Sequence, residues 1–202
     1  MNFDAVILAG GKSSRMGRDK AWLKIDGQSL LARQIQLARD VRAGEVFISG
    51  RAGVDYSSFG CRVLKDRLID AGPLGGIERA LSEASAPLVL VIAVDMPKVT
   101  ASFLRRFISR CDDGVGIVAR VSGEIEPLVA IYPKAARGLI EGMFAVRARS
   151  ASKGEAAREQ TRAPRATAFA EKCVERGLVK LVALVEGETL FFENWNSPED
   201  VE

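Results

Sequence analysis

The 202-residue chain contains no histidine and only three cysteines, and both shortages exclude kinds of chemistry. Without histidine, neither a Ser–His or Cys–His catalytic pair nor a His-containing metal site can form. The cysteines are widely separated and include no CxxC pair, which argues against zinc ribbons and thioredoxin-like redox sites. Their odd number and spacing are typical of free thiols in a reducing cytoplasm. These residues are Cys61, Cys111 and Cys173.

A long apolar run and a large net charge are also lacking. No apolar run approaches the ~18 residues of a membrane span, and residues 1–4 lack the features of a signal peptide. We therefore expect a cytoplasmic protein with no membrane partner. The net charge of +3 is too small to require a nucleic acid as partner. Basic residues are nevertheless concentrated in residues 12–24 and 134–180, which favours one or two sites for anionic small molecules.

What the chain does contain is an alternation of strand-like and helix-like segments. With 48% hydrophobic and 27% charged residues, the composition is that of an ordinary globular chain. We predict one domain over residues 1–202, built as a single doubly wound, mostly parallel α/β sheet with helices on both faces. Residues 148–165 are expected to form an exposed connection. The predicted strands are 3–8, 45–49, 61–64, 88–94, 116–119, 128–132, 181–185 and 190–192, and the predicted helices are 30–38, 76–84, 101–108, 134–147 and 166–176.

The segment after the first predicted strand is a candidate phosphate-binding loop. Gly10-Gly11 ends the strand and leads into a basic stretch that includes Arg15 and Lys20. The segment is not a Walker loop, because Arg15 or Met16 stands where that motif requires glycine, and its adjacent glycines do not fit the dinucleotide fingerprint. Backbone N–H groups of a diglycine turn can still approach a phosphate closely. A surface turn with a solvated basic face is the alternative.

Asp95 follows the most apolar run, residues 88–94, and is a candidate metal ligand. Ligands of open α/β sheets bind beyond the carboxyl ends of the strands, where both Gly10-Gly11 and Asp95 are predicted to lie. Mg²⁺ typically binds one or two carboxylates together with substrate phosphates and water. The alternative is that Asp95 caps the following helix or a turn.

Three further segments carry candidate ligand contacts. Asp66 precedes Gly72-Pro73-Leu74-Gly75-Gly76, whose glycines would let the backbone approach a flat ligand, although a tight turn before a helix explains them equally well. Asn194 and Asn196 are alternate residues of an extended segment, so their side chains are expected to point the same way. Glu126, before Pro127, is a weaker candidate for a carboxylate at a strand start.

Together these segments resemble the molybdenum cofactor guanylyltransferases, a family of the nucleotidyltransferase superfamily. The pattern LAGGxSxRMGxDK over residues 8–20 is similar to the superfamily signature, which is specific for nucleotidyl transfer but not for the base. Three further segments narrow the choice among families of this superfamily: residues 72–76, 94–97 and 194–200. Their order and spacing match the molybdenum cofactor guanylyltransferases over nearly the whole chain. The resemblance implies a Rossmann-like nucleotidyltransferase fold with a nucleotide-binding half (1–100) and a pterin-side half (101–202).

The resemblance also implies an activity and its cofactor. GMP would be transferred from GTP to the terminal phosphate of molybdopterin, with Mg²⁺ required and pyrophosphate released. That phosphate has a second pKa near ~6 and is already an anion at neutral pH, so it needs no general base. Molybdenum-insertion proteins and apo-molybdoenzymes or their chaperones would be further partners.

Site roles are carried over from the family residue by residue. Two positions depart from its pattern: Lys98 stands where a bulky apolar residue is frequent, and an asparagine often found near Ser49 is missing, so no nucleotide contact is carried over there. The implied roles are nucleotide contacts for Leu8, Ala9, Gly10, Gly11, Lys20, Asp66, Gly72, Pro73, Leu74 and Asp95, catalysis for Arg15, Lys20 and Asp95, Mg²⁺ binding for Asp95, and acceptor-side contacts for Asn194 and Asn196.

Four alternatives stay open at this point. Two are enzymes: a cytidylyltransferase acting on the same pterin, and a sugar-phosphate nucleotidyltransferase. Both kinds of enzyme have the same first-loop pattern as residues 8–20 of this chain. The third is a non-catalytic nucleotide-binding module that delivers cofactor to apoenzymes, and the fourth is a generic α/β domain whose glycines only make turns.

Overall fold

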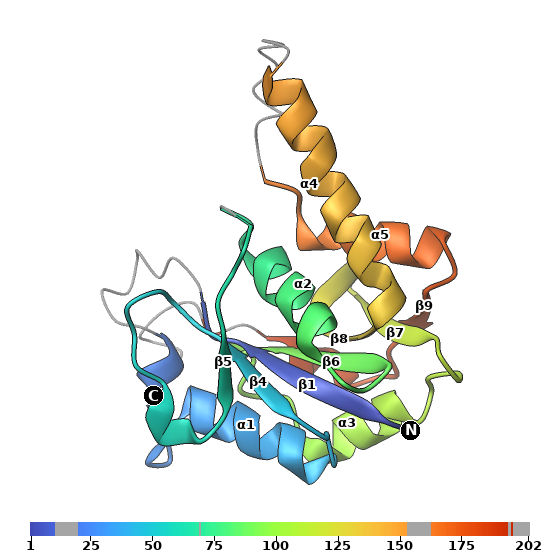
Figure 1. The fold of residues 1–202 in the computed structure, drawn as a ribbon. Coiled ribbons are helices and arrows are strands. Elements are labelled where there is room, and N and C mark those ends of the chain that lie inside the picture. The colour runs from blue at the N-terminus through green and yellow to red at the C-terminus, as the bar shows by residue number, and fades with distance from the viewer. Residues whose placement is uncertain (11–19, 69, 153–162, 194, 196–202) are drawn as a thin grey trace.

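Seven strands form one central sheet in the structure, a computed structural model that describes residues 1–10, 20–68, 70–152, 163–193 and 195 (Figure 1). The strand order is β5-β4-β1-β6-β8-β7-β9. Strand β8 is antiparallel to β6 and β7, and the other neighbouring pairs are parallel. The predicted mostly parallel α/β sheet is therefore confirmed. The strands are β1 (Phe3–Leu8), β4 (Val46–Ser49), β5 (Arg62–Leu64), β6 (Leu88–Ala93), β7 (Gly116–Val121), β8 (Glu124–Pro133) and β9 (Val179–Ala183).

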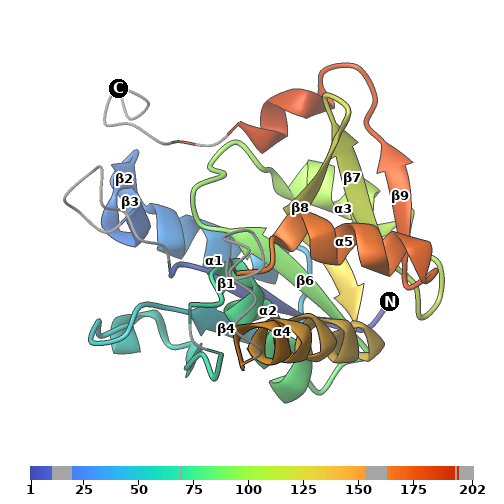
Figure 2. The same cartoon turned by 90° about the horizontal axis from the view of Figure 1, so that it is seen from above.

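Helices cover both faces of this sheet, as predicted (Figures 1 and 2). On one face lie α1 (Leu30–Asp40) and α3 (Ala101–Ile108); on the other lie α2 (Pro73–Glu83), α4 (Arg137–Ser152) and α5 (Ala166–Glu175). Among the described residues, no helix is long and apolar enough to span a membrane. The smaller elements are η1 (Lys20–Trp22), η2 (Ser57–Phe59), η3 (Lys134–Ala136) and η4 (Glu188–Phe192), and the two-stranded sheet of β2 (Lys24–Ile25) and β3 (Gln28–Ser29).

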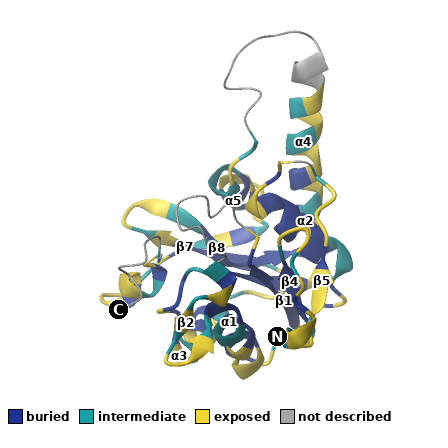
Figure 3. Cartoon of the chain, turned by 90° about the vertical axis from the view of Figure 1, so that its left-hand side faces the viewer, coloured by how far each residue is buried: buried dark blue, intermediate teal, exposed yellow. Residues whose placement is uncertain are grey.

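The central strands β1 and β6 are buried along their whole length because both faces of the sheet are covered (Figure 3). In β1, Ala5 and Ile7 face the core beneath α1 and α3, whereas Val6 and Leu8 face the core beneath α2. Alternate residues thus enter different apolar layers. This double burial explains why β6 is a continuous apolar run in the sequence and why β1 is one from Ala5 to Leu8.

Helix starts follow the capping chemistry of the sequence. The Ser29 hydroxyl accepts a hydrogen bond from the Ala32 N–H at 3.2 Å, and the Thr100 hydroxyl accepts one from the Phe103 N–H at 3.2 Å. Helix α2 begins three residues before its predicted start, with Pro73 in the first turn. Proline is favoured there because its fixed φ suits a helix and the N–H that it lacks would have no helical partner.

Two predictions in the second half of the chain are wrong. Residues 190–192 belong to the helical turn η4 and not to a strand; Phe191 and Phe192 pack against Phe103 of α3, so this short apolar run covers a helix instead of joining the sheet. The exposed connection predicted from residue 148 is helical at first, because α4 continues to Ser152. Residues 153–162 lie outside the described residues.

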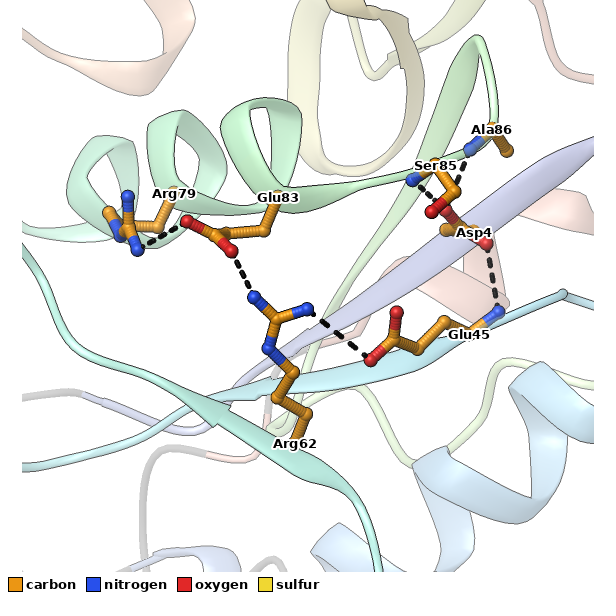
Figure 4. A network of polar contacts seen from close by, with 7 residues as sticks. All are labelled: Asp4, Glu45, Arg62, Arg79, Glu83, Ser85 and Ala86. Carbon is orange, nitrogen blue, oxygen red and sulfur yellow. Dashed lines mark hydrogen bonds and ion pairs between the residues drawn. The ribbon is translucent and has the colours of Figure 1, made fainter.

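A buried carboxylate, Asp4, ties the first strand to two neighbouring segments (Figure 4). Asp4 is 3% exposed and accepts hydrogen bonds from the backbone N–H groups of Glu45, Ser85 and Ala86 at 2.8, 2.8 and 2.9 Å. The carboxylate therefore satisfies donors at the start of β4 and before β6.

Replacing Asp4 by alanine should lower the free energy of unfolding by about 3 kcal/mol, because three backbone donors lose their acceptor and a buried unpaired donor costs about 1–3 kcal/mol. Urea denaturation followed by circular dichroism measures this change. The exposed Asp113 provides the matched control, since Asp113→Ala should shift stability by less than about 0.5 kcal/mol. Equal losses in the two variants would contradict the assigned role of Asp4.

Candidate active site

The carboxyl ends of β1 and β6 and the N-terminus of α2 meet at one edge of the sheet and line a cleft. The predicted glycine turn and the predicted metal ligand thus lie together, although 85 positions of sequence separate Gly10 from Asp95. The predicted site residues that line the cleft are Leu8, Ala9, Gly10, Lys20, Gly72, Pro73 and Asp95, and Ser49, Ala93, Val94 and Leu128 join them.

The end of β1 approaches β4 too closely for a side chain to fit well at residue 10. The backbone N–H groups of Ala9 and Gly10 both donate to the Ser49 carbonyl, at 2.8 and 2.9 Å. A Cβ atom on Gly10 would lie 3.2 Å from the Gly50 carbonyl oxygen. Glycine therefore allows the β1 end to bend into the cleft. The predicted residues Gly11 and Arg15 lie outside the described residues.

The N-terminus of α2 borders the cleft through Gly72 and Pro73. Gly72 adopts φ +56°, which favours glycine, and no side chain caps the helix. An uncapped helix N-terminus carries partial positive charge and binds anions. Gly76 has a packing role, because a Cβ there would lie 2.2 Å from the Ser49 hydroxyl oxygen. Leu74, a predicted nucleotide contact, has its side chain fully buried in the core and is not among the residues lining the cleft.

Lys20 and Asp95 form an ion pair inside the cleft. The Lys20 Nζ lies 3.0 Å from Asp95 Oδ2, and the two side chains are 17% and 26% exposed. Lys20 belongs to η1 and Asp95 follows β6, so the pair joins the end of the first loop to the central strand. Both charges are only partly screened by water and remain accessible to a ligand.

The donor chemistry of Asp95 fits a hard divalent cation such as Mg²⁺. Mg²⁺ prefers oxygen ligands and usually keeps waters and substrate phosphates in addition to one or two carboxylates. Within the described ranges, no group of three or more His, Cys, Asp or Glu side chains could hold a metal ion. A cation bound here would therefore complete its coordination with substrate and water.

Glu126 is a second carboxylate at this edge of the sheet. It lies at the start of β8, which pairs with β6 in antiparallel register, and its Oε1 accepts a hydrogen bond from the Leu128 N–H at 2.9 Å. Burial raises the pKa of Glu126; the Leu128 hydrogen bond lowers it, and the negative charge of Asp95 raises it further.

The raised pKa of Glu126 predicts a pH-dependent gain in stability for Glu126→Gln. A carboxyl group with a raised folded-state pKa stabilises the fold below its unfolded pKa, and this contribution is lost as pH rises through the folded pKa. The glutamine variant, which keeps an acceptor for Leu128, should therefore melt at a higher temperature than the wild type at about pH 7–8, and at an equal temperature below about pH 4. Thermal denaturation across this range, with the exposed Glu124→Gln as control, measures the effect; a gain independent of pH would contradict it.

Asp66 lies beside the first turn of α2 but is not among the residues lining the cleft. A Cβ on Gly75 would lie 2.6 Å from Asp66 Oδ2, so the second glycine of the turn makes room for this carboxylate. Burial raises the pKa of Asp66 and the charge of Glu78 raises it further, whereas Arg79 lowers it.

The C-terminal segment also reaches the cleft edge. The Trp195 N–H donates to the Asp95 carbonyl at 3.0 Å, so the chain between the two predicted asparagines passes beside Asp95. Asn194 and Asn196 themselves lie outside the described residues. Lys98, which departs from the family pattern, forms an ion pair with Glu193 just before this contact.

Gly10, a helix N-terminus, a lysine and a carboxylate meet at the carboxyl ends of adjacent strands, which is where α/β proteins with an open sheet bind their ligands. Comparison with known proteins narrows the possibilities. The model of the MobA-like NTP transferase domain matches residues 5–163, and the chain belongs to this family.

Individual relatives carry more specific names. The chain is 36% identical over 197 residues to a probable molybdenum cofactor guanylyltransferase of Opitutus terrae, covering 96% of this chain and 90% of the relative. It is 41% identical over 139 residues to the molybdenum cofactor guanylyltransferase of Rhizobium meliloti, covering 65% and 63% of the two chains. A solved structure, the molybdopterin-guanine dinucleotide biosynthesis protein A from Archaeoglobus fulgidus, superposes with a TM-score of 0.67 at 20% identity, covering 98% and 94% of the two chains, and supports the fold.

Proposed function

We propose that this chain transfers GMP from GTP to the terminal phosphate of molybdopterin, forming a guanine dinucleotide cofactor and pyrophosphate. The observation that carries the proposal is the shared cleft of Gly10, Lys20 and Asp95, in a chain with a relative of nearly equal length that is named a probable molybdenum cofactor guanylyltransferase. The free cysteines are compatible with a cytoplasmic location. The product would pass to apo-molybdoenzymes or their chaperones, with molybdenum-insertion proteins as further partners.

Electrostatic repulsion is the main obstacle to this reaction, since two polyanions must approach each other. Two unit charges ~4 Å apart repel by about 4 kcal/mol at an effective dielectric constant of ~20. In the proposed mechanism, Lys20 neutralises phosphate charge, and backbone N–H groups at the start of α2 donate hydrogen bonds that orient the phosphates. The absence of a side chain at Gly10 lets the phosphates approach the end of β1. Asp95 would hold Mg²⁺, which supplies further charge neutralisation when bound. Positioning and electrostatics then account for catalysis, as is usual for phosphoryl transfer.

The proposed nucleophile requires no basic side chain from the protein. The chain has no histidine, and burial raises the pKa of both Cys111 and Cys173 to about 12, so neither is a thiolate at neutral pH. A phosphate with a second pKa near ~6 is already ionised. A phosphate acceptor therefore needs no general base, whereas an alcohol acceptor would need one.

The test is pyrophosphate release with molybdopterin and Mg²⁺ in the presence of GTP, CTP, ATP or UTP in turn. We expect release with GTP to exceed release with each other nucleotide by at least about tenfold, equal to about 1.4 kcal/mol. Preference for CTP would identify a cytidylyltransferase instead, and release only with a sugar phosphate as acceptor would identify the second enzymatic alternative. Nucleotide binding without pyrophosphate release would favour a delivery module.

A further inference from the structure

Side chains of α1 hold the turn that follows Asp95. Gln34 Nε2 donates a hydrogen bond to the Met96 carbonyl at 2.8 Å, and Arg33 Nε donates one to the Pro97 carbonyl at 3.2 Å. These bonds join residues more than sixty positions apart in the sequence. Two adjacent residues of one helix therefore fix two adjacent carbonyls of the turn between β6 and α3.

A third carbonyl of the same turn is also fixed from a distant segment. The Asp95 carbonyl accepts the Trp195 N–H at 3.0 Å, and the Lys20 ammonium holds the Asp95 carboxylate. The backbone from the Asp95 carbonyl to the Pro97 carbonyl is thus restrained by bonds to other parts of the fold. The direction of this side chain depends on that restraint, since a carboxylate joined to Cα by a single methylene follows its backbone closely.

Gln34 occupies a place that is unfavourable for an amide. The residue is fully buried, and its Oε1 atom has no hydrogen-bond partner among the described residues. Its neighbours on the inner face of α1, Leu31 and Ile35, are apolar. Because an apolar side chain would avoid the unpaired oxygen, stability of the helix packing does not account for the glutamine. The bond to Met96 does account for it.

We infer that Gln34 is a positioning residue for the proposed transfer reaction: it acts on turnover through the Asp95 carboxylate, with Arg33 in a supporting role. The kinetic part of this inference rests on the proposed function. Displacing a reacting or charge-stabilising group by about 1 Å can lower a rate by about 10²-fold. Loss of one of the four bonds that restrain this turn and the Asp95 side chain should displace Asp95 by less than 1 Å, so we expect a decrease in kcat of about tenfold.

The test compares Gln34→Met with Gln36→Met, the same substitution at an exposed position of the same helix, where the amide contacts only Asp40 among the described residues. Amide hydrogen exchange over residues 94–99 reports on the turn without reference to activity. We expect faster exchange and a tenfold lower kcat in Gln34→Met, with a KM for GTP changed less than about threefold and a melting temperature within about 3 °C of the wild type. Gln36→Met should match the wild type in all four measurements.

A double-mutant cycle separates positioning from a general structural effect. If Gln34 acts through Asp95, then adding Gln34→Met to Asp95→Asn should leave kcat nearly unchanged. The same tenfold loss in that background, unchanged exchange over residues 94–99, or unchanged kcat despite faster exchange would each overturn the inference. If the wild type itself releases no pyrophosphate, the proposed function and the kinetic claim fail together, and the exchange measurement still decides whether Gln34 holds the turn.

Discussion

Asp95→Asn should lower turnover by about 10²–10³-fold, the loss typical of removing one electrostatic stabiliser from an active site. Asparagine keeps the size of the side chain and one oxygen, but it removes the negative charge that would bind a divalent cation and that holds Lys20 at 3.0 Å. Affinity for GTP in the absence of metal should fall much less, because the contacts at the β1 end and the α2 N-terminus do not involve this carboxylate.

Pyrophosphate release as a function of Mg²⁺ or Mn²⁺ concentration measures the effect of Asp95→Asn. The variant should need a higher metal concentration for half-maximal rate in addition to its lower maximal rate. Asp113→Asn, at an exposed position, controls for the substitution itself. Metal-dependent rates equal to those of the wild type would remove Asp95 from the mechanism.

Lys20→Ala should weaken GTP binding by about 10–150-fold. Hydrogen bonds to charged groups contribute about 1.5–3 kcal/mol, which corresponds to this range of dissociation constants. Isothermal titration calorimetry measures the affinity, and far-UV circular dichroism checks that the fold is intact. Lys24→Ala is the matched control, because Lys24 is an exposed lysine of the neighbouring strand β2. Equal GTP affinity in the two variants would contradict a phosphate-binding role for Lys20.

Much of the fold could be predicted because burial leaves a strong signal in the sequence. Strands β1 and β6 are covered on both faces, so β6 and residues 5–8 of β1 are unbroken apolar runs. The predicted bounds of both strands agree with the observed bounds to within one residue. The prediction of a strand at residues 190–192 is wrong because a short apolar run carries a weaker signal. Three apolar residues fit a strand or a helical turn equally well, and only their packing against Phe103 decides between the two.

The cleft could be predicted in part because sheet topology brings strand ends together. Gly10 and Asp95 both follow buried strands, so their meeting at one edge follows from the parallel sheet. Ser49 and Leu128 also line the cleft, but small and apolar residues are common throughout the chain, so the sequence does not mark them as site residues. The bond from Gln34 to Met96 spans 62 residues and joins an amide to a backbone carbonyl, which no sequence pattern reveals.

The short strand β5 at one edge of the sheet, with three residues, has a consequence for behaviour at high concentration. An open edge offers free backbone groups on which another copy of the chain can add a strand. Here Arg62, which bridges Glu45 and Glu83 (Figure 4), places a charged cluster along that edge, and Lys180 of β9 does the same at the opposite edge. Extension of the sheet from one molecule to the next is therefore disfavoured, which protects the protein against fibril-like aggregation.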